Sequence, residues 1–129
     1  MSEPIVYISH NRVKPGQLEA LRELYHETVK DIEATRPGTL VHLGYVSADG
    51  SEITYLHVFP SAEAMDRHMQ GVPERARAAY EFMQPVRLEV YGQPSPGTLA
   101  AIRRIAGEGV ALSLNPQHLG GYIRPGAPL

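Results

Sequence analysis

Two histidines, His42 and His57, are the residues of this chain whose spacing most clearly suggests chemistry. Each lies in an apolar segment, and the two segments flank Asp49-Gly50, a preferred hairpin turn. A hairpin centred on that turn pairs the two histidines directly, with β-carbons about 4.5–5.5 Å apart. Imidazoles at that spacing could share a proton, coordinate a metal ion or bracket a substrate oxygen.

The same register brings aromatic and polar side chains to the face that carries the two histidines. Tyr55 pairs with Gly44 there, and we expect it to act in catalysis together with the histidines. Tyrosines on this face could orient a phenolic or quinone-like substrate, or they could simply fill an interface. The side chains that we expect to bind substrate are Tyr7, Ser9, Phe59, Arg87, Glu89 and Tyr91.

The histidine face could hold a metal ion. Glu89 is expected on it, which would complete the set of two histidines and one carboxylate that suits iron or zinc. The histidines could instead serve acid–base catalysis, which imidazole supports near neutral pH, or form a polar lining bonded to Tyr55, Glu89 or water. We expect no bound metal and no cofactor; the sequence contains no glycine-rich phosphate loop and no nucleophile elbow.

These side chains would be positioned by a β-α-β-β-α-β unit. Leu18, Leu21, Tyr25 and Ile32 recur at helical spacing, and Ser61 is a natural N-cap for a later helix. The expected elements are strands at residues 5–11, 39–47, 52–60 and 86–92, and helices at residues 17–34, 61–69 and between Pro73 and Pro85. This order predicts an α+β, ferredoxin-like fold with an antiparallel sheet.

The chain continues past this unit. We expect a ferredoxin-like domain at residues 1–92 and a C-terminal extension at residues 93–129. The extension should contain a short helix at residues 98–106 and a further strand at residues 110–114. Its remainder is rich in proline and glycine, so we expect an irregular arm wrapped over the body or over a partner subunit.

Composition narrows the class of protein. A chain of 129 residues fits one domain with a real core, and a net charge of −2 gives no basic surface for nucleic acid. The absence of cysteine removes disulfides and thiolate chemistry. Neither a transmembrane run nor a signal-peptide pattern is present, so we expect no membrane partner and a cytoplasmic protein.

Both faces of the expected sheet are apolar enough to need a cover. We expect the helices to cover the aliphatic face, which holds Val6, Ile8, Val41, Leu43, Leu56, Val58, Leu88 and Val90. The histidine face would then lie bare, although exposed apolar patches of that extent usually mark an interface or a ligand groove. We therefore expect a homodimer in which two histidine faces pack together around a ligand-sized space.

Three segments of the chain resemble the antibiotic biosynthesis monooxygenase family of dimeric α+β barrels. Residues 13–19, Val-Lys-Pro-Gly-Gln-Leu-Glu, resemble the family's opening from strand to helix. Residues 36–40, Arg-Pro-Gly-Thr-Leu, resemble its entry into strand two, and residues 59–64 with His68 resemble the end of strand three and the next helix. The resemblance covers residues 5–92 and implies a dimeric barrel of the ferredoxin-like kind.

The resemblance also implies a function. It suggests a cofactor-independent monooxygenase acting on a small aromatic or polyketide-like molecule, with His68 joining the catalytic residues. The chain departs from the oxidising members at Ser9, where they often carry asparagine, and at Phe59, where they often carry tryptophan. Two different functions fit the same fold: an isomerase or cyclase that uses the same histidine pair, and a barrel that binds a small molecule without turnover.

Overall fold

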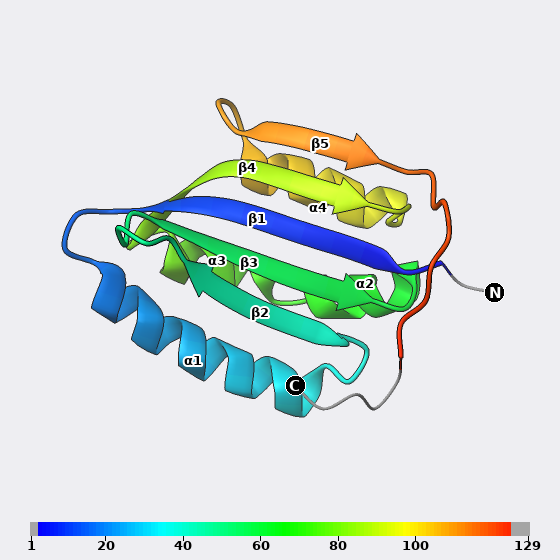
Figure 1. Cartoon of the computed structure of the whole chain (residues 1–129), viewed down its shortest axis with the longest axis horizontal. Coiled ribbons are helices and arrows are strands. Elements are labelled where there is room, and N and C mark those ends of the chain that lie inside the picture. Colours follow the sequence, from blue (N-terminus) through cyan, green and yellow to red (C-terminus); the bar gives the residue numbers. More distant parts are fainter. Residues whose placement is uncertain (1–2, 125–129) are drawn as a thin grey trace.

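The computed structural model describes residues 3–124 and contains one five-stranded sheet with four helices on one side of it (Figure 1). The strands are β1 (Ile5–Val13), β2 (Val41–Val46), β3 (Glu52–Phe59), β4 (Met83–Tyr91) and β5 (Ala111–Asn115). The helices are α1 (Leu18–Thr35), α2 (Ala62–Met69), α3 (Val72–Ala79) and α4 (Pro96–Ala106). In the part of the chain that is described, no helix is long and apolar enough to cross a membrane.

The sheet has the strand order β2-β3-β1-β4-β5. The first four strands pair antiparallel, as the ferredoxin-like pattern requires, and the predicted α+β fold is confirmed. The fifth strand comes from the C-terminal extension and pairs with β4 in parallel, after α4 has crossed the helical side. The extension therefore widens the same sheet.

The predicted register of the hairpin is confirmed, while its turn has another form. Val46 pairs with Ile53 and His42 pairs with His57, as a hairpin centred on residues 49–50 demands. The connection is a four-residue loop, residues 48–51, in which Gly50 alone has a positive φ. The Asp49 carboxylate stabilises this loop by accepting hydrogen bonds from the hydroxyls of Ser47 and Ser51 and from the Ser51 amide.

Local signals account for the two short helices that follow β3. The Ser61 side chain accepts a hydrogen bond from the Ala64 amide, which makes it the N-cap of α2 as predicted. Gly71 then adopts the left-handed conformation with φ of 83°, which ends the α2 segment and lets α3 start in a new direction. The strand β4 begins at Met83, earlier than predicted, and runs through Pro85.

The predicted assignment of the two faces of the sheet is wrong for strands β1, β2 and β3. The side chains that alternate with the aliphatic ones are the buried set, and they pack against the chain's own helices. In one cluster Ile5, Tyr7 and Phe59 meet Met65 of α2 and Ile102 of α4. The histidine face is therefore the helix-covered face. It packs inside one chain, so it is not the surface on which two subunits could meet.

The opposite face carries the aliphatic side chains and is not covered by any described residue of the chain. Val6, Ile8, Leu43, Leu56 and Val58 are half-buried there. The same face carries a polar group in which His10 contacts Glu89, Arg87 lies 3.4 Å from Glu89, and Tyr91 donates a hydrogen bond to Glu89. We call this surface the open face. The expectation that Arg87, Glu89 and Tyr91 share a face with His42 and His57 is wrong, because Glu89 pairs with Ile8 and Tyr91 with Val6.

The last described segment, residues 116–124, follows β5 without forming a helix or strand. Figure 1 shows it leaving the end of β5 and running past the end of the sheet towards α1. Leu119 is fully exposed and Tyr122 is 83% exposed, so neither packs on the body of its own chain. We call this segment the arm; the rest of the predicted irregular region, residues 125–129, lies outside the described residues.

Candidate functional site

A cavity of about 130 Å³ lies between the histidine face of the sheet and the helices α1 and α3. Its apolar wall comes from the helices and includes Leu21, Leu24, Val72 and Ala76. Its polar wall comes mainly from the sheet and includes Tyr7, Ser9, His42, Tyr55 and His57, with His68 from α2. A concave apolar site with a few convergent polar groups is the usual form of a small-molecule pocket.

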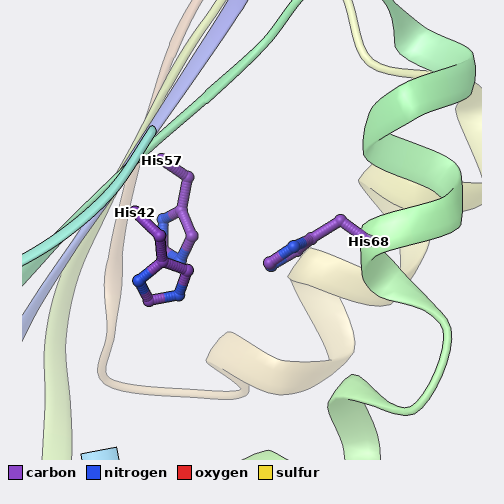
Figure 2. A group of neighbouring side chains, drawn as sticks. All are labelled: His42, His57 and His68. Carbon is purple, nitrogen blue, oxygen red and sulfur yellow. The ribbon is translucent and has the colours of Figure 1, made fainter. Parts of the chain in front are cut away.

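Three histidines meet at this cavity. His42 comes from β2, His57 from β3 and His68 from α2, and the rings converge as Figure 2 shows. The ring centroids of His42 and His57 are 4.5 Å apart, and that of His68 lies 5.3 Å from His57 and 5.9 Å from His42. The predicted pair is therefore part of a triad, and the third member is the one that the family resemblance suggested.

Each histidine is held through its Nδ1 atom by an oxygen. Nδ1 of His57 lies 2.9 Å from the backbone carbonyl of Tyr7, Nδ1 of His42 lies 3.0 Å from the Tyr25 hydroxyl, and Nδ1 of His68 lies 2.9 Å from the Thr39 hydroxyl. A carbonyl oxygen only accepts, so Nδ1 of His57 carries the proton and its Nε2 atom has a free lone pair. The two hydroxyls can donate or accept, so they fix the ring orientations and leave either tautomer open.

The three Nε2 atoms are the ones available to a ligand. None of them has a hydrogen-bond partner within residues 3–124. Each keeps some accessible surface, because none is among the described buried polar atoms that lack a partner. The three residues all line the cavity, so a ligand held by these atoms would lie in it. The site therefore presents three imidazole nitrogens to one small space.

Burial keeps these imidazoles uncharged. Loss of water lowers the pKa of His57 to about 4, against a weaker opposing effect of the Tyr7 carbonyl. Burial, followed by repulsion from His57, also lowers the pKa of His42 to about 3. The pKa of His68 falls for the same reasons, with contributions from the positive charges of Arg75 and Arg36. At neutral pH all three imidazoles are therefore neutral, and the same burial makes each of them a weaker base than a free histidine.

Tyr25 of α1 is a site residue that the sequence pattern placed only in a helix stripe. Its ring stacks on Tyr55, with centroids 5.0 Å apart and planes 13° from parallel, and its hydroxyl contacts His42. Burial raises the pKa of Tyr25 to about 12, so its hydroxyl stays protonated. The opposing Gly44 leaves room for this ring, because a β-carbon there would lie 2.9 Å from the Tyr25 Cζ atom.

Two more polar residues at the cavity escaped prediction. Arg75 of α3 lines it and donates hydrogen bonds to the backbone carbonyls of His68 and Gln70. Asn11 lies two residues beyond Ser9 on the same face of β1, and both line the cavity. The resemblance placed Ser9 where oxidising members of that family often carry asparagine, and in this chain an asparagine lies one pleat further on. Period-two spacing from Ser9 was the signal that could have found Asn11.

The remaining predicted site residues lie in three different places: at the cavity, in the core and on the open face. Tyr7, Ser9 and Tyr55 line the cavity with the histidines. Phe59 has no exposed surface and packs in the core beside His57 and His68, so it does not line the cavity. The other three predicted substrate-binding residues, Arg87, Glu89 and Tyr91, lie on the open face.

This arrangement can move protons and hold an anion. A neutral imidazole with one fixed N–H can accept a proton at Nε2, and nearby tyrosine hydroxyls can relay or donate one. The guanidinium of Arg75 supplies a positive charge beside the space where an oxyanion would form. Tyr25 and Tyr55, whose rings stack on each other, both line the cavity and add aromatic surface to its wall.

No protein-family model matches this chain, and no curated protein matches it either. Solved structures do match. MupZ from Pseudomonas fluorescens aligns over 99% of this chain and 100% of its own, with 17% identity and a TM-score of 0.70. SnoaB, a cofactor-independent oxygenase from Streptomyces nogalater, aligns over 73% of this chain and 96% of its own, with 14% identity and a TM-score of 0.61.

A structure from Caulobacter crescentus, provisionally named an antibiotic biosynthesis monooxygenase, aligns over 73% of this chain and 92% of its own, with 18% identity and a TM-score of 0.63. The chain therefore has the fold of the antibiotic biosynthesis monooxygenase-like structures, and the resemblance noted in its sequence is confirmed at that level. The alignment with MupZ covers 99% of the chain, so it takes in elements of the C-terminal extension as well.

Proposed function

We propose that the chain is a cofactor-independent monooxygenase-like enzyme that acts on a small aromatic or polyketide-like molecule bound in the cavity. The observation that carries this proposal is the fixed tautomer of His57. Its Nδ1–H donates to the Tyr7 carbonyl, which leaves a free Nε2 lone pair at a cavity with stacked aromatic rings. A base held in one orientation next to an aromatic surface suits the removal of a phenolic proton.

The reaction would begin with that proton. His57 accepts it at Nε2, and the guanidinium of Arg75 stabilises the electron-rich anion that results. The anion reduces molecular oxygen directly. A phenol becomes a quinone by losing its hydroxyl proton and one ring hydrogen and gaining one oxygen atom, while the second oxygen atom leaves as water. The protein's part is orientation, proton transfer and exclusion of water.

The cavity suits a substrate of this size. Its volume of about 130 Å³ is close to that of the engineered apolar cavity of about 150 Å³ that holds benzene. One aromatic ring would fill it, against the stacked pair of Tyr25 and Tyr55, and a larger ligand would extend beyond it. The description of SnoaB as a cofactor-independent oxygenase supports the reaction class by analogy of fold alone.

The test is oxygen uptake with 1-naphthol and anthrone as probes. We expect uptake and a quinone-type product that carries one atom of labelled oxygen gas, and we expect His57→Gln to abolish both. Glu89→Gln is the matched control, because Glu89 lies on the open face away from the cavity. Product formation without oxygen would favour an isomerase or cyclase, in which the triad moves protons only. Binding of both probes with no product at all would overturn catalysis and leave a binding protein.

We further propose that the chain forms a homodimer through its open face. Half-buried aliphatic side chains such as Val6, Leu43 and Val58 form an apolar surface over β1, β2 and β3 that lies beside the polar group of His10 and Glu89. A second copy of the same face would bury these side chains by a two-fold operation. The pairing surface is thus the face opposite to the one expected from the sequence, and each subunit keeps its own cavity.

A further inference from the structure

The histidine triad has a property that proton transfer does not require. One ring nitrogen from each of His42, His57 and His68 can be chosen so that the three atoms all lie within 4.8 Å of one another. The rings come from three different elements, β2, β3 and α2, so their convergence is a result of the tertiary fold (Figure 2). Three convergent imidazoles with an open side are the ligand set of many catalytic zinc sites.

The surroundings of the three rings match what metal ligation needs. Histidine ligands almost always donate their second ring N–H to an oxygen, which orients the ring towards the ion. Here the Tyr7 carbonyl, the Tyr25 hydroxyl and the Thr39 hydroxyl hold the three Nδ1 atoms. The low pKa values of the triad add to this, since a neutral imidazole is the form that binds metal.

We propose that His42, His57 and His68 form a binding site for a divalent transition-metal ion of the Zn²⁺ class, coordinated by their Nε2 atoms with the fourth position facing the cavity. In a tetrahedral site with metal–nitrogen bonds of about 2.0–2.1 Å, the nitrogens lie about 3.4 Å apart. Ring nitrogens that lie within 4.8 Å of one another reach this separation when they close by at most about 1.4 Å. Side-chain rotation can supply this, since the triad borders a cavity.

One charged group opposes the ion. Arg75 lines the same cavity, and its positive charge lowers the pKa of all three histidines. The same charge would repel a cation bound to them. A neutral three-histidine site beside an arginine should bind metal more weakly than the same site alone. The charge on Arg75 therefore provides a second, independent test of where the ion sits.

The experiment titrates the whole 129-residue chain, stripped of metal, with Co²⁺ and follows the visible bands of a tetrahedral cobalt complex. We expect one ion per chain and displacement by Zn²⁺. The variants His42→Gln and His68→Gln should abolish the cobalt spectrum. Thr39→Val, which removes only the oxygen that orients His68, should weaken binding about 10–100-fold.

Two comparisons make the result specific. His10→Gln is the matched control, because His10 lies on the open face and should leave the cobalt titration unchanged. Arg75→Gln should tighten binding, whereas Arg75→Lys, which keeps the charge, should not. Cobalt binding that survives in the variant with all three triad histidines changed to glutamine would overturn the site, as would a wild-type protein that develops no tetrahedral spectrum.

The metal site does not depend on the proposed reaction, because the cobalt spectrum is read without substrate. The two proposals compete for the same Nε2 lone pair of His57. Zinc should therefore inhibit oxygen uptake from 1-naphthol, and a chelator should restore it. An enzyme that is active and never binds cobalt would refute the metal site alone, and a cobalt-binding protein without turnover would refute the reaction alone.

Discussion

The ring of Tyr25 lies directly against Gly44, at a position where a β-carbon would come within 2.9 Å of its Cζ atom. This contact lets α1 bring a tyrosine to the sheet, where the ring stacks on Tyr55 and the hydroxyl reaches His42. Gly44, in the middle of β2, therefore leaves room for the Tyr25 ring, which forms part of the cavity wall.

Gly44→Ala should displace the Tyr25 ring and loosen the orientation of His42. We expect a loss of about 1–3 kcal/mol in the free energy of unfolding, as overpacking typically costs. Chemical denaturation would measure it. The same substitution in a Tyr25→Ala background should cost clearly less, because the clashing ring is gone.

The matched control for this prediction is Gly97→Ala. A β-carbon at Gly97 meets no atom within 4 Å, and the residue lies in the first turn of α4. That change should be neutral or stabilising by up to about 1 kcal/mol. Equal losses for Gly44→Ala and Gly97→Ala would contradict the contact between Tyr25 and Gly44.

The tautomer of His57 is a direct prediction of the bond to the Tyr7 carbonyl. Nitrogen-15 NMR of the histidine side chains at neutral pH should show His57 neutral, with its proton on Nδ1 and none on Nε2. Comparison with His57→Gln would assign the signal. A proton found on Nε2 would remove the lone pair on which both the base and the metal ligand depend.

The open face should mediate dimer formation, so a charge placed in its aliphatic part should separate the subunits. We expect Leu43→Arg to convert a dimer to a folded monomer, because an arginine buried in an apolar interface without a partner is costly. Light scattering coupled to gel filtration gives the mass. Leu114→Arg is the control, since Leu114 is an exposed leucine of β5 that pairs with Val90 of the helix-covered face. A variant that remains dimeric after Leu43→Arg would place the interface elsewhere.

The arm should contribute to the same assembly. Leu119 and Tyr122 are exposed in the single chain, which suggests that they pack on the second subunit. The double change Leu119→Ser and Tyr122→Ser should raise the dissociation constant of the dimer at least about tenfold, or about 1.4 kcal/mol, as sedimentation measures it. The unfolding of the monomeric Leu43→Arg variant should not respond to these two changes, because neither side chain packs on the body of its own chain.

Much of the fold could be predicted from local signals. Asp49-Gly50 set the hairpin register, and Ser61 marked the start of α2. These signals act over a few residues and need no knowledge of distant contacts. The early start of β4 was missed, because Pro85 indicates the end of an element more strongly than the interior of one.

The assignment of faces failed because both faces of the sheet carry apolar residues. Val6 and Ile8 on one side are as apolar as Ile5 and Tyr7 on the other, so periodicity identifies two faces without saying which one the helices cover. The pairing of β1 with β4 shows only which residues share a face, and it puts Leu88 and Val90 on the face of Ser9 and Tyr7. Ser9 lies opposite Leu88, and the register shifts at the next step, between His10 and Asn11. No local signal revealed that shift.

The candidate site, too, could be predicted only in part from the sequence. The pairing of His42 with His57 came from the hairpin alone, and the observed register confirms it. A third metal-binding group was sought at Glu89, on the sheet, whereas the structure brings the helical residue His68 to the pair. Met65 and His68 are the buried residues of α2, and their three-residue spacing was the available signal that His68 faces inward.

The parallel strand β5 has a consequence for how the molecule behaves in solution. Without it, β4 would be the last strand of the sheet and would present a row of unpaired amides and carbonyls. Such an edge recruits strands from other molecules and starts aggregation. The bonds from β5 to β4, closed at one end by the Gly92 amide and the Asn115 carbonyl, occupy that edge, and the sheet ends instead on β5, which has five residues where β4 has nine. The residues after Gly92 thus shorten the exposed edge on this side of the sheet, and short edge strands are one way in which proteins limit such pairing.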